Sequence, residues 1–225
     1  MDTEITKLRV IITGATGMVG EGVLFECLAH PAVEQVLMVN RRPYRAKHPK
    51  LRECIVPDFL DLDEFTSQFT GYDACFYCAG VSSRGMSESE YSHITYDVTT
   101  HFAHKLAILN PQMVFTYVSG SLTDSSEKGR LMWARVKGKT ENALMRSAFR
   151  KVYNFRPGFM KPTLGQQNIK PYYQAIGWLY PLLRVLFPNQ VSTTREVGLA
   201  MINSVLRGYP KQVLEVKDIK SLAKA

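Results

Sequence analysis

Residues 8–20 constrain this chain more than any other stretch, because an apolar β-branched run leads directly into three closely spaced glycines. Gly14, Gly17 and Gly20 follow the run, and a helical pattern continues from there to about Ala29. Glycines adopt positive φ and allow close approach to the backbone, so this order predicts a strand, a tight turn and a helix N-terminus. Free N–H groups and the helix dipole attract phosphate at such a turn. The junction therefore predicts a dinucleotide pyrophosphate site, with a structural turn that binds nothing as the alternative, and its residues are Gly14, Thr16, Gly17, Met18, Val19 and Gly20.

Strand-like and helix-like segments alternate along the rest of the chain. The expected strands are Leu8–Thr13, Val36–Asn40, Arg52–Val56, Ala74–Cys78, Met113–Ser119, Lys151–Phe155 and Gln212–Val216. The expected helices are Met18–Ala29, Leu62–Phe69, Ser87–Leu109, Arg130–Phe149, Pro171–Phe187 and Thr194–Arg207. This alternation, with strands that are apolar almost throughout, predicts a doubly wound parallel α/β sheet of the Rossmann type.

The chain length suits a single domain, so we expect residues 1–225 to form one NAD(P)-binding unit. Residues 157–193 are rich in proline and glycine and interrupt the alternation. Ligands of open α/β sheets bind at the carboxyl ends of the strands. We therefore expect this irregular stretch to form a small lobe or lid on the substrate side.

The end of the second expected strand selects between the two nicotinamide dinucleotides. An acidic residue about 20 positions after the glycines would hold the 2′-hydroxyl of NAD, but Asn40, Arg41 and Arg42 stand there. Two guanidinium groups favour a 2′-phosphate, so we expect NADP, with NAD the less favoured cofactor and solvated arginines as the alternative. Two other strand ends fit around the same ligand, at the adenine and at the ribose and nicotinamide: Asp58 with Phe59, and Cys78 with Ala79 and Gly80.

Composition sets the remaining limits. The formal charge of +8 favours anionic ligands, but the basic residues are scattered, so no nucleic-acid partner is expected. The N-terminus lacks an apolar signal segment, and Pro181 and Arg184 interrupt the most apolar late stretch, so we expect a cytoplasmic protein without membrane insertion. Its four cysteines are expected to be reduced. Cys75 and Cys78 lie three residues apart in a strand and therefore point to opposite faces.

At this point the residues resemble the short-chain dehydrogenase/reductase superfamily, in its extended or atypical branch of NAD(P)-dependent epimerase/dehydratase-like proteins. The resemblance covers most of the chain. It rests on the glycine turn and on Asp58, Cys78, Ala79, Gly80, Tyr117, Val118, Ser119, Lys137, Gly138, Glu141, Arg156, Pro157 and Gly158. It implies oxidoreductase or epimerase-type hydride chemistry on a small, unidentified substrate.

The family's mechanism uses a serine, a tyrosine and a lysine. Lys137 carries over as the lysine that binds the cofactor ribose, and Ser119 as the serine that holds the substrate oxygen, with Ser121 a near second. The tyrosine does not carry over, because Trp133 stands four residues before Lys137, and an indole N–H cannot shuttle a proton at neutral pH. Either another group is the proton donor, or the chain is a non-catalytic NADP(H)-binding sensor or interaction protein.

Several further residues have two alternative roles. Tyr91, Tyr96 and Tyr117 are candidates to replace the missing phenol, with packing as the alternative for each, and Trp133 is either a packing residue or a stacking wall for an aromatic substrate.

Asp97, His101 and His104 share a helix face, but solvated faces commonly carry such residues, so no metal site is expected. The resemblance places Arg156, Pro157 and Gly158 beside the nicotinamide, although Arg156 is equally able to pair with a buried carboxylate. Many relatives dimerise through the two long helices expected at 87–109 and 130–149, which makes a homodimer possible.

Overall fold

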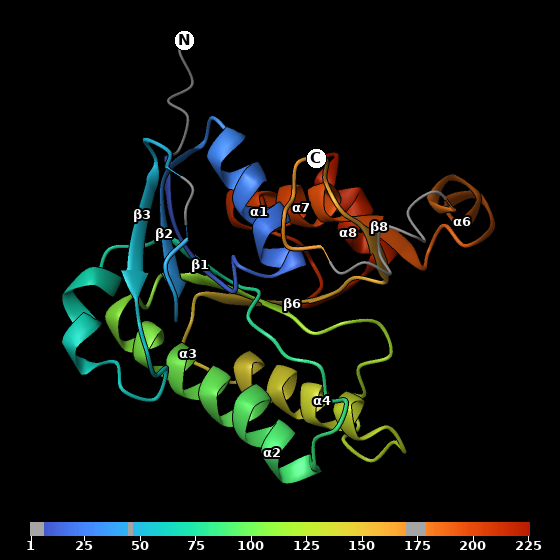
Figure 1. The fold of residues 1–225 in the computed structure, drawn as a ribbon, viewed down its shortest axis with the longest axis horizontal. Helices are drawn as coiled ribbons and strands as arrows, with labels where there is room; N and C mark the ends of the chain where they lie inside the picture. Colours follow the sequence, from blue (N-terminus) through green and yellow to red (C-terminus); the bar gives the residue numbers. More distant parts are fainter. Residues whose placement is uncertain (1–6, 45–46, 170–178) are drawn as a thin grey trace.

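The computed structural model describes residues 7–44, 47–169 and 179–225 (Figure 1). Within them, seven parallel strands form the central sheet in the order β3-β2-β1-β4-β5-β6-β9. These strands are β1 (Leu8–Thr13), β2 (Val33–Asn40), β3 (Leu51–Ile55), β4 (Ala74–Tyr77), β5 (Val114–Val118), β6 (Lys151–Arg156) and β9 (Val213–Glu215). The order reverses direction between β1 and β4, which is where doubly wound sheets open a ligand crevice.

Helices cover both faces of this sheet, so the predicted doubly wound α/β architecture is confirmed (Figure 1). One face carries α1 (Met18–Ala29), α7 (Thr194–Leu206) and α8 (Val216–Ala223). The other carries α2 (Glu88–Ser92), α3 (Val98–Leu109) and α4 (Met132–Met145). A 3₁₀ helix, η1 (Asp63–Phe69), precedes β4, and α6 (Tyr180–Leu186) projects from the body beside the small two-stranded sheet of β7 (Phe159–Lys161) and β8 (Val191–Thr193).

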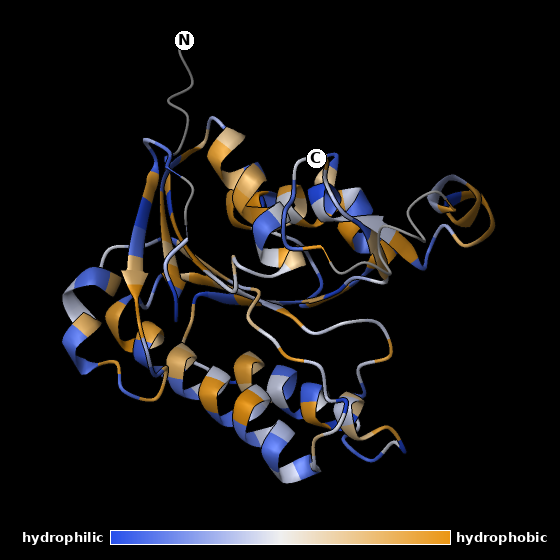
Figure 2. Ribbon diagram, viewed as in Figure 1, coloured by the Kyte–Doolittle hydropathy of each residue, from blue (hydrophilic) through white to orange (hydrophobic). Residues whose placement is uncertain are grey.

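The core consists of two apolar clusters, one on each face of the sheet. Alternate residues of a strand point to opposite faces, and accordingly Val10 and Ile12 of β1 pack in one cluster while Ile11 packs in the other. Figure 2 shows orange, apolar ribbon along the central strands and in helices of both layers, as two-sided burial requires.

Two features differ from the sequence-based expectation, and a third expectation lies partly outside the described residues. The helix expected over 87–109 is divided into α2, a π-helical turn η2 (His93–Asp97) and α3. The short strands β7 and β8 were not predicted, since three residues give no usable periodicity, and α8 was not predicted because its start was assigned to the last strand. Of the helix expected over 171–187, only the part from Tyr180 on is described, because residues 170–178 lie outside the described residues.

Candidate functional site

The glycine turn between β1 and α1 has the tight geometry that its sequence predicts. Gly14 has φ +69°, and a Cβ there would lie 2.6 Å from the backbone of Ala79. A Cβ on Gly20 would lie 2.2 Å from the carbonyl oxygen of Gly14. Only glycine fits at these two positions, because a side chain would clash with main-chain atoms that cannot move away. The turn therefore brings the N-terminus of α1 directly against the end of β4.

A cavity of about 410 Å³ opens beside this turn, at the carboxyl ends of the central strands. It is lined by parts of the chain that are far apart in sequence, including most of the residues predicted to hold a cofactor. Those that line it are Gly14, Thr16, Gly17, Asn40, Arg41, Asp58, Phe59, Cys78, Ala79, Gly80 and Lys137.

Eight other residues that the sequence analysis assigned to the site do not line this cavity. They are Met18, Val19, Gly20, Arg42, Ser119, Arg156, Pro157 and Gly158. Gly20 packs under the turn, and Arg42 is exposed on the loop after β2. A Cβ on Gly158 would lie 1.8 Å from the carbonyl oxygen of Gln190, so this glycine allows two main-chain segments to approach each other closely.

The cavity has the features that a dinucleotide requires. A Cβ on Gly17 would meet only the Gly14 oxygen at 3.4 Å, and one on Gly80 would meet nothing within 4 Å, so open space lies above both. The buried Nδ2 of Asn40 has no hydrogen-bond partner among the described residues. A buried donor without a partner is costly, and a ligand oxygen at this position would satisfy it.

Glu21 is a residue of this region that the sequence reasoning missed. Its carboxylate is fully buried in the first turn of α1, where it accepts hydrogen bonds from the main-chain N–H groups of Gln167 (3.0 Å) and Asn168 (2.9 Å) and from the hydroxyl of Tyr44 (3.1 Å). It thus joins the loop after β2 and the loop after β7 to the turn. An acidic residue in the first turn of the largely apolar 18–29 helix was the signal that could have found it.

A buried polar network lies behind Lys137. The Lys137 ammonium donates to the main-chain carbonyl of Ser119, and burial lowers the pKa of Lys137 to about 8, although the charge of Glu141 acts in the opposite direction. The hydroxyl of Ser119 donates to Glu141 Oε1 at 2.5 Å. Arg156 contacts the same fully buried carboxylate through Nη2 at 2.5 Å and Nε at 3.0 Å. Arg156 therefore pairs with a buried carboxylate, which was the alternative for this residue.

The candidate phenols separate into two groups. Tyr91 and Tyr117 line the cavity, together with Tyr77, whereas Tyr96 lies in a separate groove between α3 and α4 with Lys139 Nζ 4.1 Å from its ring centroid. Burial raises the pKa of Tyr91 and Tyr117, and raises that of Tyr77 to about 12. All three phenols are thus held in the protonated form near neutral pH. Trp133 does not line the cavity.

The structure also shows the surroundings of Asp97 and of the four cysteines. Asp97 approaches His93 at 3.3 Å, and among the described residues no three His, Cys, Asp or Glu side chains are grouped to hold a metal ion. The four cysteines are free thiols, and Cys78 lines the cavity while the other three are buried. In the described parts of the chain, no helix is long and apolar enough to cross a bilayer.

Comparisons with known proteins agree with this geometry. Protein HTATIP2 of Rattus norvegicus is 27% identical over 161 residues, which make up 71% of this chain but only 65% of the rat protein. "Protein fmp52-1, mitochondrial" of Aspergillus terreus is 26% identical over 160 residues, covering 68% of this chain and 67% of that protein.

Among solved structures, Bordetella bronchiseptica WbmF in complex with NAD+ matches with a TM-score of 0.66 at 14% identity, over 99% of this chain and 78% of that one. The ADP-L-glycero-D-manno-heptose-6-epimerase of Helicobacter pylori matches with a TM-score of 0.65 at 15% identity, over 100% of this chain and 84% of that one. At these identities the likeness shows the fold alone. The model of the NAD dependent epimerase/dehydratase family matches residues 10–124, just over half of the chain, and this protein belongs to that family.

Proposed function

We propose that this protein binds NADP(H) in the cavity beside the glycine turn and uses it for oxidoreductase or epimerase-type hydride chemistry on a small substrate. The observation that carries the proposal is the buried Nδ2 of Asn40, which has no partner among the described residues and belongs to a residue that lines the cavity together with Arg41 and Gly17. Neutral and cationic side chains at the end of β2 suit a phosphorylated ribose, since a carboxylate there would repel it.

Arg41 is the side chain that we propose to hold the 2′-phosphate. It lines the cavity, and its charge lies close enough to the Tyr77 phenol to act on it, whereas Arg42 does not line the cavity. A charge-assisted hydrogen bond contributes about 1.5–3 kcal/mol, which corresponds to a tenfold or larger preference for NADPH over NADH. Titration of both cofactors by calorimetry tests this. Arg41→Ala is expected to remove the preference, and an unchanged preference would refute the assignment.

Lys137 is the group that we propose to move the proton. Bound nicotinamide supplies or accepts a hydride at its C4, and a carbonyl oxygen that gains a hydride at its carbon must also gain a proton. Lys137 lines the cavity and, with a pKa of about 8, is an ammonium at neutral pH that is able to release a proton. Its hydrogen bond to the Ser119 carbonyl fixes its position.

The other predicted catalytic group has less support from the geometry. The hydroxyl of Ser119 is buried and donates to Glu141, so its contact with a substrate oxygen stays a prediction. We propose instead that Ser119 acts through its main-chain carbonyl, which orients the lysine.

A second function, a cofactor-binding sensor without catalysis, is favoured by Trp133 at the position of the family's tyrosine. The two functions are separated by measuring NADPH-dependent reduction across a panel of carbonyl compounds. If the wild type reduces any of them and Lys137→Ala does not, the protein is an enzyme. If the wild type reduces none but Trp133→Tyr does, the sensor function is supported. If calorimetry detects binding of neither NADPH nor NADH, both proposals fail.

A further inference from the structure

Helix α6 exposes apolar side chains in a way that no other described helix does. Leu182, Val185 and Leu186 are 55%, 76% and 58% exposed, and Phe187, directly after the helix, is 47% exposed. Residues three and four apart share one helix face, so three of these side chains form a continuous apolar surface. Large exposed apolar side chains elsewhere in the described residues are separated along the chain. Figure 2 shows orange, apolar ribbon at α6, which projects from the body.

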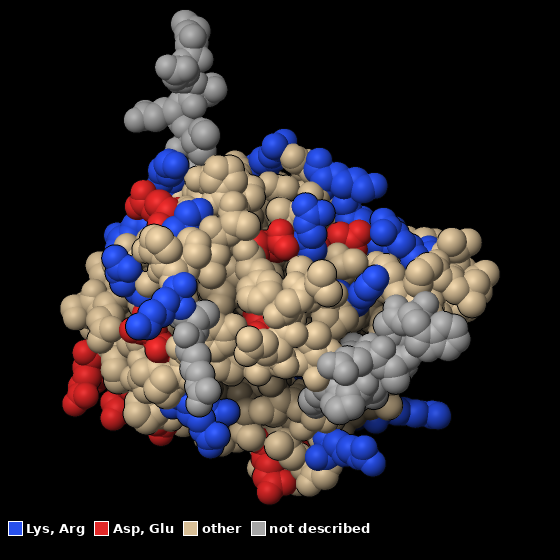
Figure 3. Space-filling model, turned by 45° about the horizontal axis from the view of Figure 1, so that its top comes forward, with Lys and Arg blue, Asp and Glu red and all other residues tan. Residues whose placement is uncertain are grey.

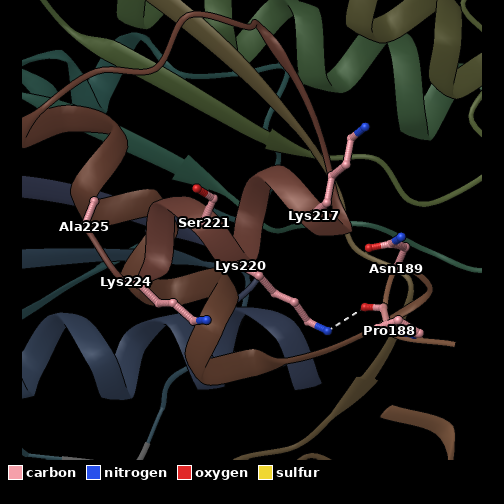
Figure 4. A pocket seen from close by; sticks show the side chains of 7 residues that line it. All are labelled: Pro188, Asn189, Lys217, Lys220, Ser221, Lys224 and Ala225. Atoms are coloured by element: carbon pink, nitrogen blue, oxygen red, sulfur yellow. Dashed lines mark hydrogen bonds between the residues drawn. The ribbon is translucent and has the colours of Figure 1, made fainter. Parts of the chain in front are cut away.

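Helix α8 carries a row of lysines beside this apolar surface. Lys217, Lys220 and Lys224 are spaced three and four residues apart, which places them along one side of the helix, and they line a shallow hollow together with Pro188 and Asn189 (Figure 4). Basic side chains also gather on this part of the surface in Figure 3.

The lysine row and the apolar helix are physically continuous. Lys220 Nζ donates to the carbonyl oxygen of Pro188 at 2.6 Å, immediately after Phe187, and this bond joins α8 to the end of α6 (Figure 4). Burial lowers the pKa of Lys220, the charge of Glu196 raises it, and the charges of Arg184 and Lys224 lower it, so these charged groups lie near one another.

Basic side chains predominate around this surface. Lys161 Nζ lies 5.4 Å from the ring centroid of Tyr180 at the start of α6, which adds a further cation. Glu196 is the acidic residue that approaches Arg184, at 3.9 Å, but it also caps helix α7 and its side chain is only 18% exposed. A partner that covers this surface must therefore combine negative charge with apolar groups.

We propose that α6 and the lysine row of α8 form a docking surface for a membrane that contains anionic phospholipids. Leu182, Val185, Leu186 and Phe187 enter the headgroup region, and Lys217, Lys220, Lys224 and Arg184 contact lipid phosphates. An apolar helix face flanked by lysines is the pattern of proteins that lie on a membrane without crossing it. Each basic side chain near an anionic surface contributes about fivefold in affinity, and the apolar groups add to this.

This inference does not depend on the proposed NADP(H) chemistry, because its residues lie outside the cavity at the glycine turn. Co-sedimentation of the full chain with lipid vesicles tests it, with vesicles of phosphatidylcholine and phosphatidylglycerol compared with pure phosphatidylcholine. The wild type is expected to sediment with the anionic vesicles, less so as salt is raised, and hardly at all with the neutral ones.

Two variants divide the surface into its apolar and charged parts. We expect Val185→Ser/Leu186→Ser and Lys217→Gln/Lys224→Gln each to weaken sedimentation with anionic vesicles by about tenfold or more. The matched controls are Ile108→Ser, an exposed apolar residue on α3, and Lys47→Gln/Lys128→Gln, which removes the same charge elsewhere. Both controls are expected to bind like the wild type. Circular dichroism and NADPH affinity report whether each variant is folded.

Three results would overturn the proposal. The first is absence of sedimentation with either kind of vesicle, and the second is equal loss in the surface variants and the controls. The third is a dimer, seen by analytical ultracentrifugation of the wild type, that Val185→Ser/Leu186→Ser converts to monomer while vesicle binding is absent. In that case a second copy of the chain covers the surface.

Discussion

Two ends of the candidate site differ in how closely they follow the family to which this protein belongs. The binding end is the glycine turn, and the proposed catalytic end is Lys137 with the buried network behind it. At the turn, Gly14 and Gly20 have the close packing that their spacing predicts, and the buried Nδ2 of Asn40 has no hydrogen-bond partner among the described residues. At the other end, Trp133 replaces the expected phenol, and the hydroxyl of Ser119 is taken up by Glu141. The difference teaches that the shape of the turn and the side chains around Lys137 are separately encoded. The first depends on the close packing of the backbone, and the second on a few side chains that change without disturbing the fold.

Arg156→Met is expected to have the largest effect, because it leaves the fully buried Glu141 carboxylate without its cation. Breaking a buried pair in this way costs about 3–5 kcal/mol, measured as the loss of unfolding free energy in urea. Arg135→Met is the control, since it breaks the more exposed pair with Glu88 and is expected to cost about 1 kcal/mol or less. Equal losses of unfolding free energy in the two variants would show that the pair of Arg156 and Glu141 stabilises the protein no more than an exposed ion pair does.

Gly20→Ala tests the turn end of the comparison. The new Cβ would lie 2.2 Å from the Gly14 oxygen, so the turn must distort, at a cost of about 1–3 kcal/mol in stability and with loss of NADPH binding. Gly80→Ala adds the same atom where nothing lies within 4 Å, and we expect it to leave stability nearly unchanged. Calorimetric titration and thermal unfolding of both variants check this. If Gly20→Ala binds NADPH normally, the close packing of the turn is not what shapes the site.

The sequence predicts the glycine turn well and the polar network behind Lys137 poorly. The strand and helix around the glycine turn were predicted with their observed bounds, Leu8–Thr13 and Met18–Ala29, because steric limits leave that local sequence few alternatives. The pairing of Glu141 with Ser119 and Arg156 was not predicted as the outcome, since it joins β5, α4 and β6 and depends on which side chains the sheet brings together. Long-range polar contacts have no local signature.

A pH profile of reduction sharpens the assignment at the catalytic end. Lys137, with a pKa of about 8, carries its transferable proton below that pH, so kcat for carbonyl reduction is expected to be level at lower pH and to fall about tenfold per unit above about pH 8. Lys137→Arg keeps a positive charge but does not titrate in this range. We expect it to retain NADPH binding and lose turnover. A wild-type profile that stays flat to pH 10 would exclude Lys137 as the proton donor and favour Tyr91 or Tyr117 in that role.

Tyr44→Phe is expected to have the smallest effect, and it tests whether the loop contacts at Glu21 belong to the binding end. The Tyr44 hydroxyl lies 3.1 Å from the buried Glu21 carboxylate, and losing one such hydrogen bond costs about 0.5–1.5 kcal/mol. Because this bond holds the loop that carries Arg41, we expect a several-fold rise in the Kd of NADPH, measured by calorimetry. Tyr72→Phe removes the hydroxyl that Gln35 Nε2 contacts at 2.8 Å, away from the cavity, and is expected to lower stability similarly without changing that Kd. If both variants bind NADPH like the wild type, Glu21 stabilises α1 alone, and the binding end extends no further than the residues that line the cavity.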